Sequence, residues 1–154
     1  MSRWPRGEAT IERLLATGEL DLIARSASDG RPMLAQAERR FKIAKTALAI
    51  DTDGAYTNAY DAARLAATAL LAHQGLRPTT EGGHRAVEEA LIAQFGEGFA
   101  GFRVLRRRRH ELDYPTSTYA ESSLAEAEDA IDTARQFLDA TQRILPELQF
   151  FRDT

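Results

Sequence analysis

The chain has 154 residues, contains no cysteine, and carries 20 Lys and Arg against 23 Asp and Glu, for a formal net charge of −3. Without cysteine it can form neither a disulfide framework nor a thiolate metal site, and its three histidines lie too far apart for a zinc-finger or zincin pattern. The negative net charge excludes a generally basic nucleic-acid binder, because neutralising phosphates normally takes a surplus of Lys and Arg. We therefore expect no metal and no cofactor, and any nucleic-acid binding must be local.

Hydropathy gives no sign of a membrane protein. No window approaches the roughly 20 apolar residues that a helix needs to span a bilayer, and the N-terminal stretch MSRWPRGEATIERLL has no uninterrupted apolar run. We expect a soluble, cytoplasmic protein that makes no contact with a membrane. The length fits a single domain over residues 1–154, with a core at about 9–145 and a C-terminal tail at 146–154.

The chain is expected to be all-α, an up-and-down bundle of about five to seven helices, because no stretch shows sustained strand-like alternation. The first helix covers about residues 9–17 and ends at Gly18, and a short helical segment follows at 20–24. Gly30-Arg31-Pro32 opens a long helix that reaches about residue 50. Its predicted buried stripe consists of Leu34, Ala37, Phe41, Ala44 and Leu48.

Four further helices are expected in the rest of the chain. Asp53 is predicted to cap a helix at 55–74, whose alanines let a neighbouring helix approach closely. Helices at 84–95 and 99–113 follow, the second stopped by Pro115. The last helix, at about 119–145, carries an apolar seam that packs against the bundle or a second subunit: Leu124, Ala127, Ile131, Ala134, Leu138, Thr141 and Leu145.

Five arginines fall between positions 103 and 109 and make this helix the strongest functional candidate. On a helical wheel Arg103, Arg107, His110 and Tyr114 share one stripe, and Arg106 lies beside it. One interpretation is an ordinary solvated charged face. The other is an edge that binds phosphate groups.

Arg109 differs from the other arginines because it falls close to the side of Leu105 and Leu112, where we expect it to be partly buried. A buried guanidinium needs a partner, and Asp113 is one helical turn further on. Pro115 biases Tyr114 away from helical dihedrals, so that its hydroxyl can fold back near Arg109 and His110.

At these residues the sequence resembles the HEPN family of small helical bundles. The family motif is an arginine, then a polar residue that is often Asn, Asp or His, then a few positions, then histidine. Arg109 and His110 occupy the first two places of the motif in RHELDY, and Tyr114 replaces the final histidine. The segment YDAARLAATALLAHQGLRPTTEGGHRAVEEAL also looks like the middle of HEPN domains, and the resemblance covers about residues 11–144.

The resemblance implies a homodimer in which both motifs face one cleft, where RNA is bound and cut without a metal. Arg109 would then hold the scissile phosphate, with Arg103, Arg106 and Arg107 as further phosphate contacts. Tyrosine, with a pKa near 10, is a poor base at neutral pH, so His110 becomes the candidate acid or base. We expect the neighbouring arginines to favour its neutral, proton-accepting form.

Such family members are often toxins silenced by a small nucleotidyltransferase, in some cases by adenylylation of a tyrosine near the motif. Tyr114 and Tyr119 are the candidates here. A non-catalytic HEPN module that binds RNA, nucleotide or a partner protein is the main alternative. A third interpretation makes the basic helix a docking face for an acidic protein, with the last helix forming the dimer.

Structural roles are the expected ones for the remaining polar residues. His84 is expected to pack or cap where Gly82-Gly83 enters a helix, and His73 offers less to interpret. Tyr60 and Arg64 lie one turn apart and are candidates to line a cleft, although stacking within the bundle is the expected use.

Overall fold

The computed structural model describes residues 3–79, 83–115 and 121–152. Within these ranges the chain forms six α-helices and two short strands: α1 (Glu8–Ala16), β1 (Leu20–Leu22), α2 (Arg31–Ala47), α3 (Thr52–His73), β2 (Leu76–Pro78), α4 (Gly83–Phe95), α5 (Gly101–Asp113) and α6 (Leu124–Ile144). Single 3₁₀ turns lie at Arg25–Ala27, Glu97–Phe99 and Leu145–Glu147. The prediction of an all-α bundle is confirmed.

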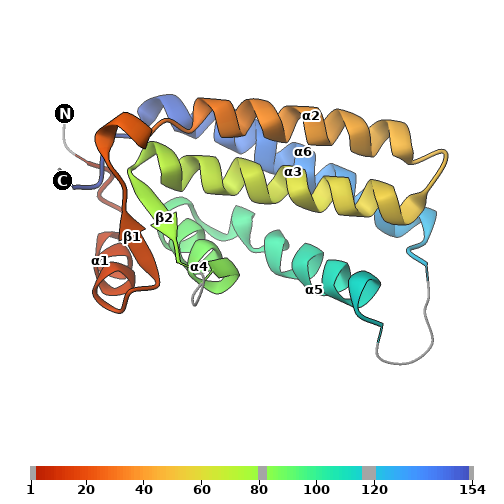
Figure 1. Ribbon diagram of the computed structural model, residues 1–154, viewed down its shortest axis with the longest axis horizontal. Coiled ribbons are helices and arrows are strands. Elements are labelled where there is room, and N and C mark those ends of the chain that lie inside the picture. Colours follow the sequence, from red (N-terminus) through yellow and green to blue (C-terminus); the bar gives the residue numbers. More distant parts are fainter. Residues whose placement is uncertain (1–2, 80–82, 116–120, 153–154) are drawn as a thin grey trace.

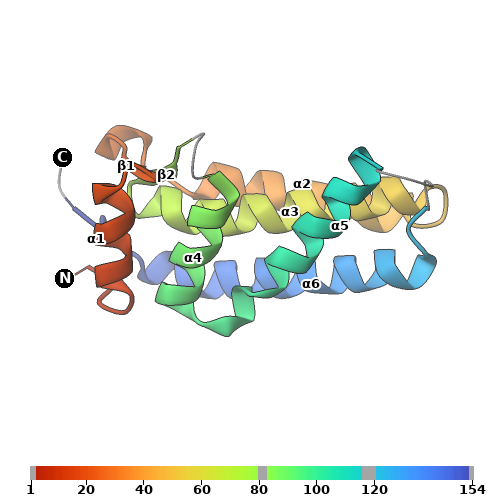
Figure 2. The ribbon, with the colours of Figure 1, turned by 90° about the horizontal axis from the view of Figure 1, so that it is seen from below.

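The three longest helices form the body of the molecule, with α3 packed against both α2 and α6 (Figure 1). Helices α4 and α5 follow one another along one side of this body, and α5 crosses it obliquely (Figure 2). Helix α1 lies beside α4 at the end of the molecule where the chain begins and finishes (Figure 2). None of the described helices combines the length and the apolar character needed to cross a bilayer.

Small side chains explain how α3 comes to lie at the centre. The alanines predicted to form its flat side are all fully buried: Ala59, Ala62, Ala63, Ala66 and Ala69. They let neighbouring helices approach closely. Gly30, at the start of α2, takes part in the same packing, because a Cβ there would clash with the carbonyl oxygen of Ala69.

The predicted helical segment at 20–24 is wrong. Leu20–Leu22 is a strand that pairs antiparallel with Leu76–Pro78, with Leu20 opposite Pro78 and Leu22 opposite Leu76. Gly18 and Gly75 precede the strands in left-handed conformations, with φ of 77° and 79°. Each strand is too short to show alternation, and its pairing partner is remote in the sequence, so local pattern carried no signal for it.

The predicted N-cap of α3 is also wrong. Asp51 occupies the N-cap position, while the Asp53 carboxylate accepts hydrogen bonds from the backbone N–H and the hydroxyl of Ser122, both at 2.8 Å. Asp53 thus joins the start of α3 to the chain before α6. Helix α6 begins at Leu124 behind a capping box of Ser123 and Glu126. The predicted start at position 119 lies outside the described residues.

The apolar seam of α6 faces α3 and α2 of the same chain. Ala127, Ile131, Ala134, Leu138 and Thr141 are buried, whereas Leu124 at its start is 53% exposed. After α6, Leu148 and Phe151 are buried in the same core, and the N–H of Phe151 donates to the carbonyl of Gln74. Part of the segment predicted as a tail therefore packs against the bundle.

Candidate functional site

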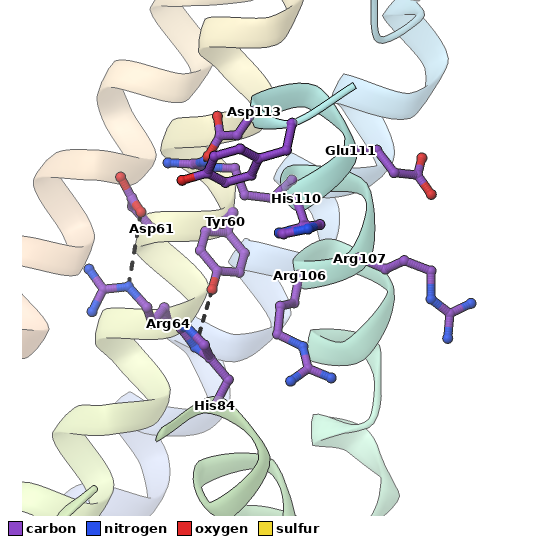
Figure 3. A pocket seen from close by; sticks show the side chains of 11 residues that line it. Tyr60, Asp61, Arg64, His84, Arg106, Arg107, His110, Glu111 and Asp113 are labelled. Carbon is purple, nitrogen blue, oxygen red and sulfur yellow. Dashed lines mark hydrogen bonds and ion pairs between the residues drawn. The ribbon is translucent and has the colours of Figure 1, made fainter. Parts of the chain in front are cut away.

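A cleft of about 740 Å³ lies between α3, the start of α4 and the second half of α5 (Figure 3). Tyr60, Asp61 and Arg64 come from α3, and His84 comes from α4. All other lining residues lie on α5, except Tyr114, which follows this helix. Three helices that are separate in the sequence thus supply one concave, polar surface.

The amphipathic pattern of α5 sets the orientation of its arginines. Phe102 and Leu105 are buried in the core, which turns the polar residues of the same helix towards solvent and the cleft. The helix ends at Asp113, and Tyr114 has φ −131° and ψ 68°, outside the helical region, as expected before Pro115.

Arg109 lies at the inner side of the cleft, with its side chain 26% exposed. Its guanidinium forms an ion pair with Asp113, as predicted, and its Cζ lies 5.8 Å from the ring centroid of Tyr60. The buried Nε has no hydrogen-bond partner among the described residues. The guanidinium is therefore held in place by an anion and an aromatic ring at the inner side of the cleft.

His110 and Tyr114 lie together where α5 ends. Their ring centroids are 5.0 Å apart with a tilt of 42° between the planes, and the Tyr114 residue is 66% exposed. Both side chains line the cleft with Arg109. The structure thus brings the three predicted motif residues to one place.

The predicted basic stripe divides in the structure. Arg106 and Arg107 line the cleft, with Arg107 extending away from Tyr60 (Figure 3). Arg103 lies outside it, over the neighbouring surface between α4 and α5, where it forms an ion pair with Glu88. Arg106 also approaches Glu88, at 3.9 Å. A helical wheel of α5 gives no sign of this division, because Glu88 belongs to another helix.

Arg108 lies between Arg107 and Arg109 in the sequence, but its side chain reaches α6 and does not line the cleft. Its Nε donates to the Glu126 carboxylate at 2.8 Å, and Glu111 is a second ion-pair partner at 3.4 Å. The hydrogen bond to Glu126 is the main cause that raises the pKa of Arg108. The pKa of Glu126 is lowered first by the backbone hydrogen bond from Ser123 and then by Arg108. Arg108 thus joins α5 to α6 and lies outside the cleft.

His84, for which the sequence favoured a structural role, lines the cleft. Its Nδ1 lies 3.5 Å from the Tyr60 hydroxyl (Figure 3). Partial burial of the ring lowers its pKa, and the positive charges of Arg106 and Arg64 lower it further. Burial raises the pKa of the Tyr60 hydroxyl. The one sequence signal was the Gly-His start of the helix, which gives no indication that His84 faces α5.

A family model described as the HEPN domain matches residues 31–144, which span α2 to α6. The chain belongs to the HEPN family. Comparisons with curated proteins and with solved structures found no match.

The HEPN match covers every helix that lines the cleft. Within the described residues no cluster of three or more His, Asp or Glu side chains is arranged to hold a metal ion.

The cleft between α3, α4 and α5 contains charges of both signs. Asp61 lies 4.0 Å from Arg64, and Asp113 pairs with Arg109, so two of its carboxylates already face an arginine of the cleft. Arg106 has its carboxylate partner, Glu88, outside the cleft, and Arg107 extends towards solvent. These two arginines leave the outer part of the cleft cationic, which suits a phosphate group.

Proposed function

We propose that this HEPN protein is a metal-independent RNA endonuclease in which RNA lies across the cleft and Arg109 holds the scissile phosphate. The observation that supports it most is the position of Arg109, which lines the cleft with its guanidinium half-buried on the Tyr60 ring. A guanidinium can donate two parallel hydrogen bonds to phosphate oxygens and stabilise the charge that develops on them during cleavage.

Two side chains beside Arg109 are proposed to take part in proton transfer. An imidazole can both accept and donate a proton, so His110 is suited to exchange a proton with the reacting oxygens. Tyr114 is a poor base but can donate a hydrogen bond from its hydroxyl. Arg106 and Arg107 are proposed to bind neighbouring phosphates of the RNA, and Arg103 a more distant phosphate over α4.

The active unit is proposed to be a homodimer, by analogy with HEPN proteins whose motifs face one shared cleft. Each subunit would then supply one Arg109 to the bound RNA. The mass of the protein in solution, measured by light scattering, tests this part. A monomer that cleaves RNA at full rate contradicts it.

The decisive experiment incubates the purified protein with labelled single-stranded RNA in the presence of EDTA. We expect cleavage by the wild type and none by Arg109→Ala. Arg143→Ala removes an exposed arginine of α6 that does not line the cleft, and serves as the matched control with full activity. Equal cleavage by wild type and Arg109→Ala would locate the activity elsewhere or in a contaminant.

The second candidate function is binding without cleavage. It is favoured by Tyr114, because the family motif has histidine there and tyrosine cannot serve as a base at neutral pH. In this case RNA remains intact in EDTA, but binding persists and weakens steeply as salt is raised. A nucleotide or a partner protein bound at the same cleft belongs to this candidate as well.

We further propose a toxin role, with a small nucleotidyltransferase as the antitoxin partner. The ring of Tyr114 is largely exposed at the rim of the cleft, where an enzyme that adenylylates tyrosine can reach it. The other candidate, Tyr119, lies outside the described residues. Growth arrest on expression of the wild type but not of Arg109→Ala tests the toxin role.

A further inference from the structure

His84 projects into the cleft from the second residue of α4 and faces the arginines of α5 (Figure 3). The residue is exposed, its contact with the Tyr60 hydroxyl is long for a hydrogen bond at 3.5 Å, and its ring centroid lies 6.5 Å from that of Phe102. Contacts this distant contribute little to folding, so stability does not account for histidine at this position.

We propose that His84 is the general base of the cleavage reaction, accepting the proton of the ribose 2′-hydroxyl in place of the histidine that Tyr114 has replaced. This inference rests on the proposed function, RNA cleavage at the same cleft, and names a base from a different helix.

Tyr60 connects the base to the phosphate-binding group. Its ring lies under the guanidinium of Arg109, and its hydroxyl contacts the Nδ1 of His84. The ring is itself fixed by stacking on Phe102, with centroids 5.6 Å apart. One rigid aromatic side chain thus contacts the guanidinium at its face and the imidazole at its hydroxyl end, which brings the proposed base and phosphate anchor to one place in the cleft.

The electrostatic surroundings favour the form of His84 that accepts a proton. Arg64 on α3 and Arg106 on α5 both lower its pKa, in addition to the larger effect of burial. Tyr60 remains protonated at neutral pH because burial raises its pKa, so it does not compete as a base. If the Nδ1–H of His84 donates to the Tyr60 oxygen, the Nε2 lone pair is free to accept the 2′-proton.

Each of the three carboxylates that line the cleft approaches an arginine. Asp61 approaches Arg64, and Asp113 pairs with Arg109. Glu111 pairs with Arg108 on the side of α6. These ion pairs direct the negative charges of the cleft to arginines, so they do not favour a protonated His84.

The step balances without a metal, water or other co-reactant. The ribose O2′ forms a bond to phosphorus while the bond from phosphorus to O5′ breaks. The 2′-proton passes to His84, and the leaving O5′ takes a proton from His110, the acid of the step. The products are a 2′,3′-cyclic phosphate and a 5′-hydroxyl end.

The test compares the wild type with His84→Gln at neutral pH in EDTA. Glutamine can still donate to Tyr60 but cannot accept a proton, so we expect cleavage to fall about 100-fold or more while RNA affinity stays unchanged. His84→Ala should fall equally and recover when free imidazole is added. His73→Asn, which changes a histidine remote from the cleft, should retain full activity.

The outcomes separate the two proposals. Undiminished cleavage by His84→Gln overturns the role of His84 and leaves the nuclease intact. Loss of RNA affinity in parallel with cleavage, without rescue by imidazole, assigns His84 to substrate binding and also overturns it. If the wild type cuts no RNA, the proposed function fails and this inference fails with it. A substrate with 2′-deoxyribose at the cut site must stay intact, because it has no proton for His84 to remove.

Discussion

The guanidinium of Arg109 lies over the ring of Tyr60, with 5.8 Å between Cζ and the ring centroid, and the same ring stacks on Phe102 in the core. The position of Arg109 is therefore set by packing between α3 and α5. A change in the core beneath Tyr60 is expected to move this guanidinium, which we propose binds phosphate, even though the changed residue touches no ligand.

We predict that Tyr60→Leu lowers the free energy of unfolding by roughly 1–2 kcal/mol, because it removes both the aromatic stacking and the cation–π contact. Tyr60→Phe keeps the ring and should cost less than about 1 kcal/mol, since the hydroxyl contact is long. Urea denaturation measures both. Equal losses in the two variants would show that the ring itself contributes nothing.

Most of the fold could be predicted from the sequence because helical periodicity and terminal Gly and Pro residues are local signals. Gly18, Gly75 and Pro115 end helices where expected, and the alanines of α3 are buried as a set. The strand pair and the role of Asp53 were missed. Both depend on a partner that is remote in the sequence, and no local pattern indicates which partner the folded chain supplies.

The same distinction applies to the cleft. The ion pair between Arg109 and Asp113 was predicted because it lies within one helix. Glu88 and His84 were missed because each reaches the arginines of α5 from α4. Positions on a single helical wheel cannot show which neighbouring helix faces which side chain.

Adjacent arginines on α5 are predicted to behave differently. Arg107→Ala should weaken RNA binding without altering stability, because Arg107 is exposed at the cleft rim. Arg108→Ala should lower stability by roughly 1 kcal/mol and leave RNA affinity unchanged, because it breaks the hydrogen bonds to Glu126. Fluorescence anisotropy and thermal unfolding measure the two effects. The reverse assignment would place the RNA on the α6 side of α5.

Glu88 is predicted to restrain RNA binding. This carboxylate is 4% exposed and forms ion pairs with Arg103 and Arg106. Glu88→Gln should free one or both arginines for phosphate, raising affinity and steepening the salt dependence by about one charge per arginine. Anisotropy titrations from about 50 to 200 mM salt measure the slope.

Glu89→Gln is the matched control for net charge, because Glu89 lies next on α4 but pairs with Arg13. It should leave the salt slope unchanged. Identical slopes for the two variants would mean that Glu88 does not compete with RNA for the arginines. Thermal unfolding of both variants confirms that the comparison is made between folded proteins.

His73 is predicted to make stability depend on pH. Its Nδ1 accepts a hydrogen bond from the N–H of Gly30 at 3.2 Å, and burial lowers its pKa below the ordinary 6.5. Asp29 opposes this shift and Arg31 adds to it, both less strongly than burial. Between the lowered pKa and 6.5 the unfolded chain binds more protons than the folded one. Stability should therefore be constant above that range and fall as pH drops through it.

Urea denaturation at about pH 7.5 and about pH 5.5 measures this loss. His73→Asn replaces Nδ1 by an amide oxygen that can accept the same hydrogen bond but does not titrate. The variant should match the wild type at the higher pH and lose less stability at the lower one. The loss should persist in part, because the pKa of His84 is lowered too and contributes with the same sign. An unchanged loss in His73→Asn would assign the pH dependence to other groups.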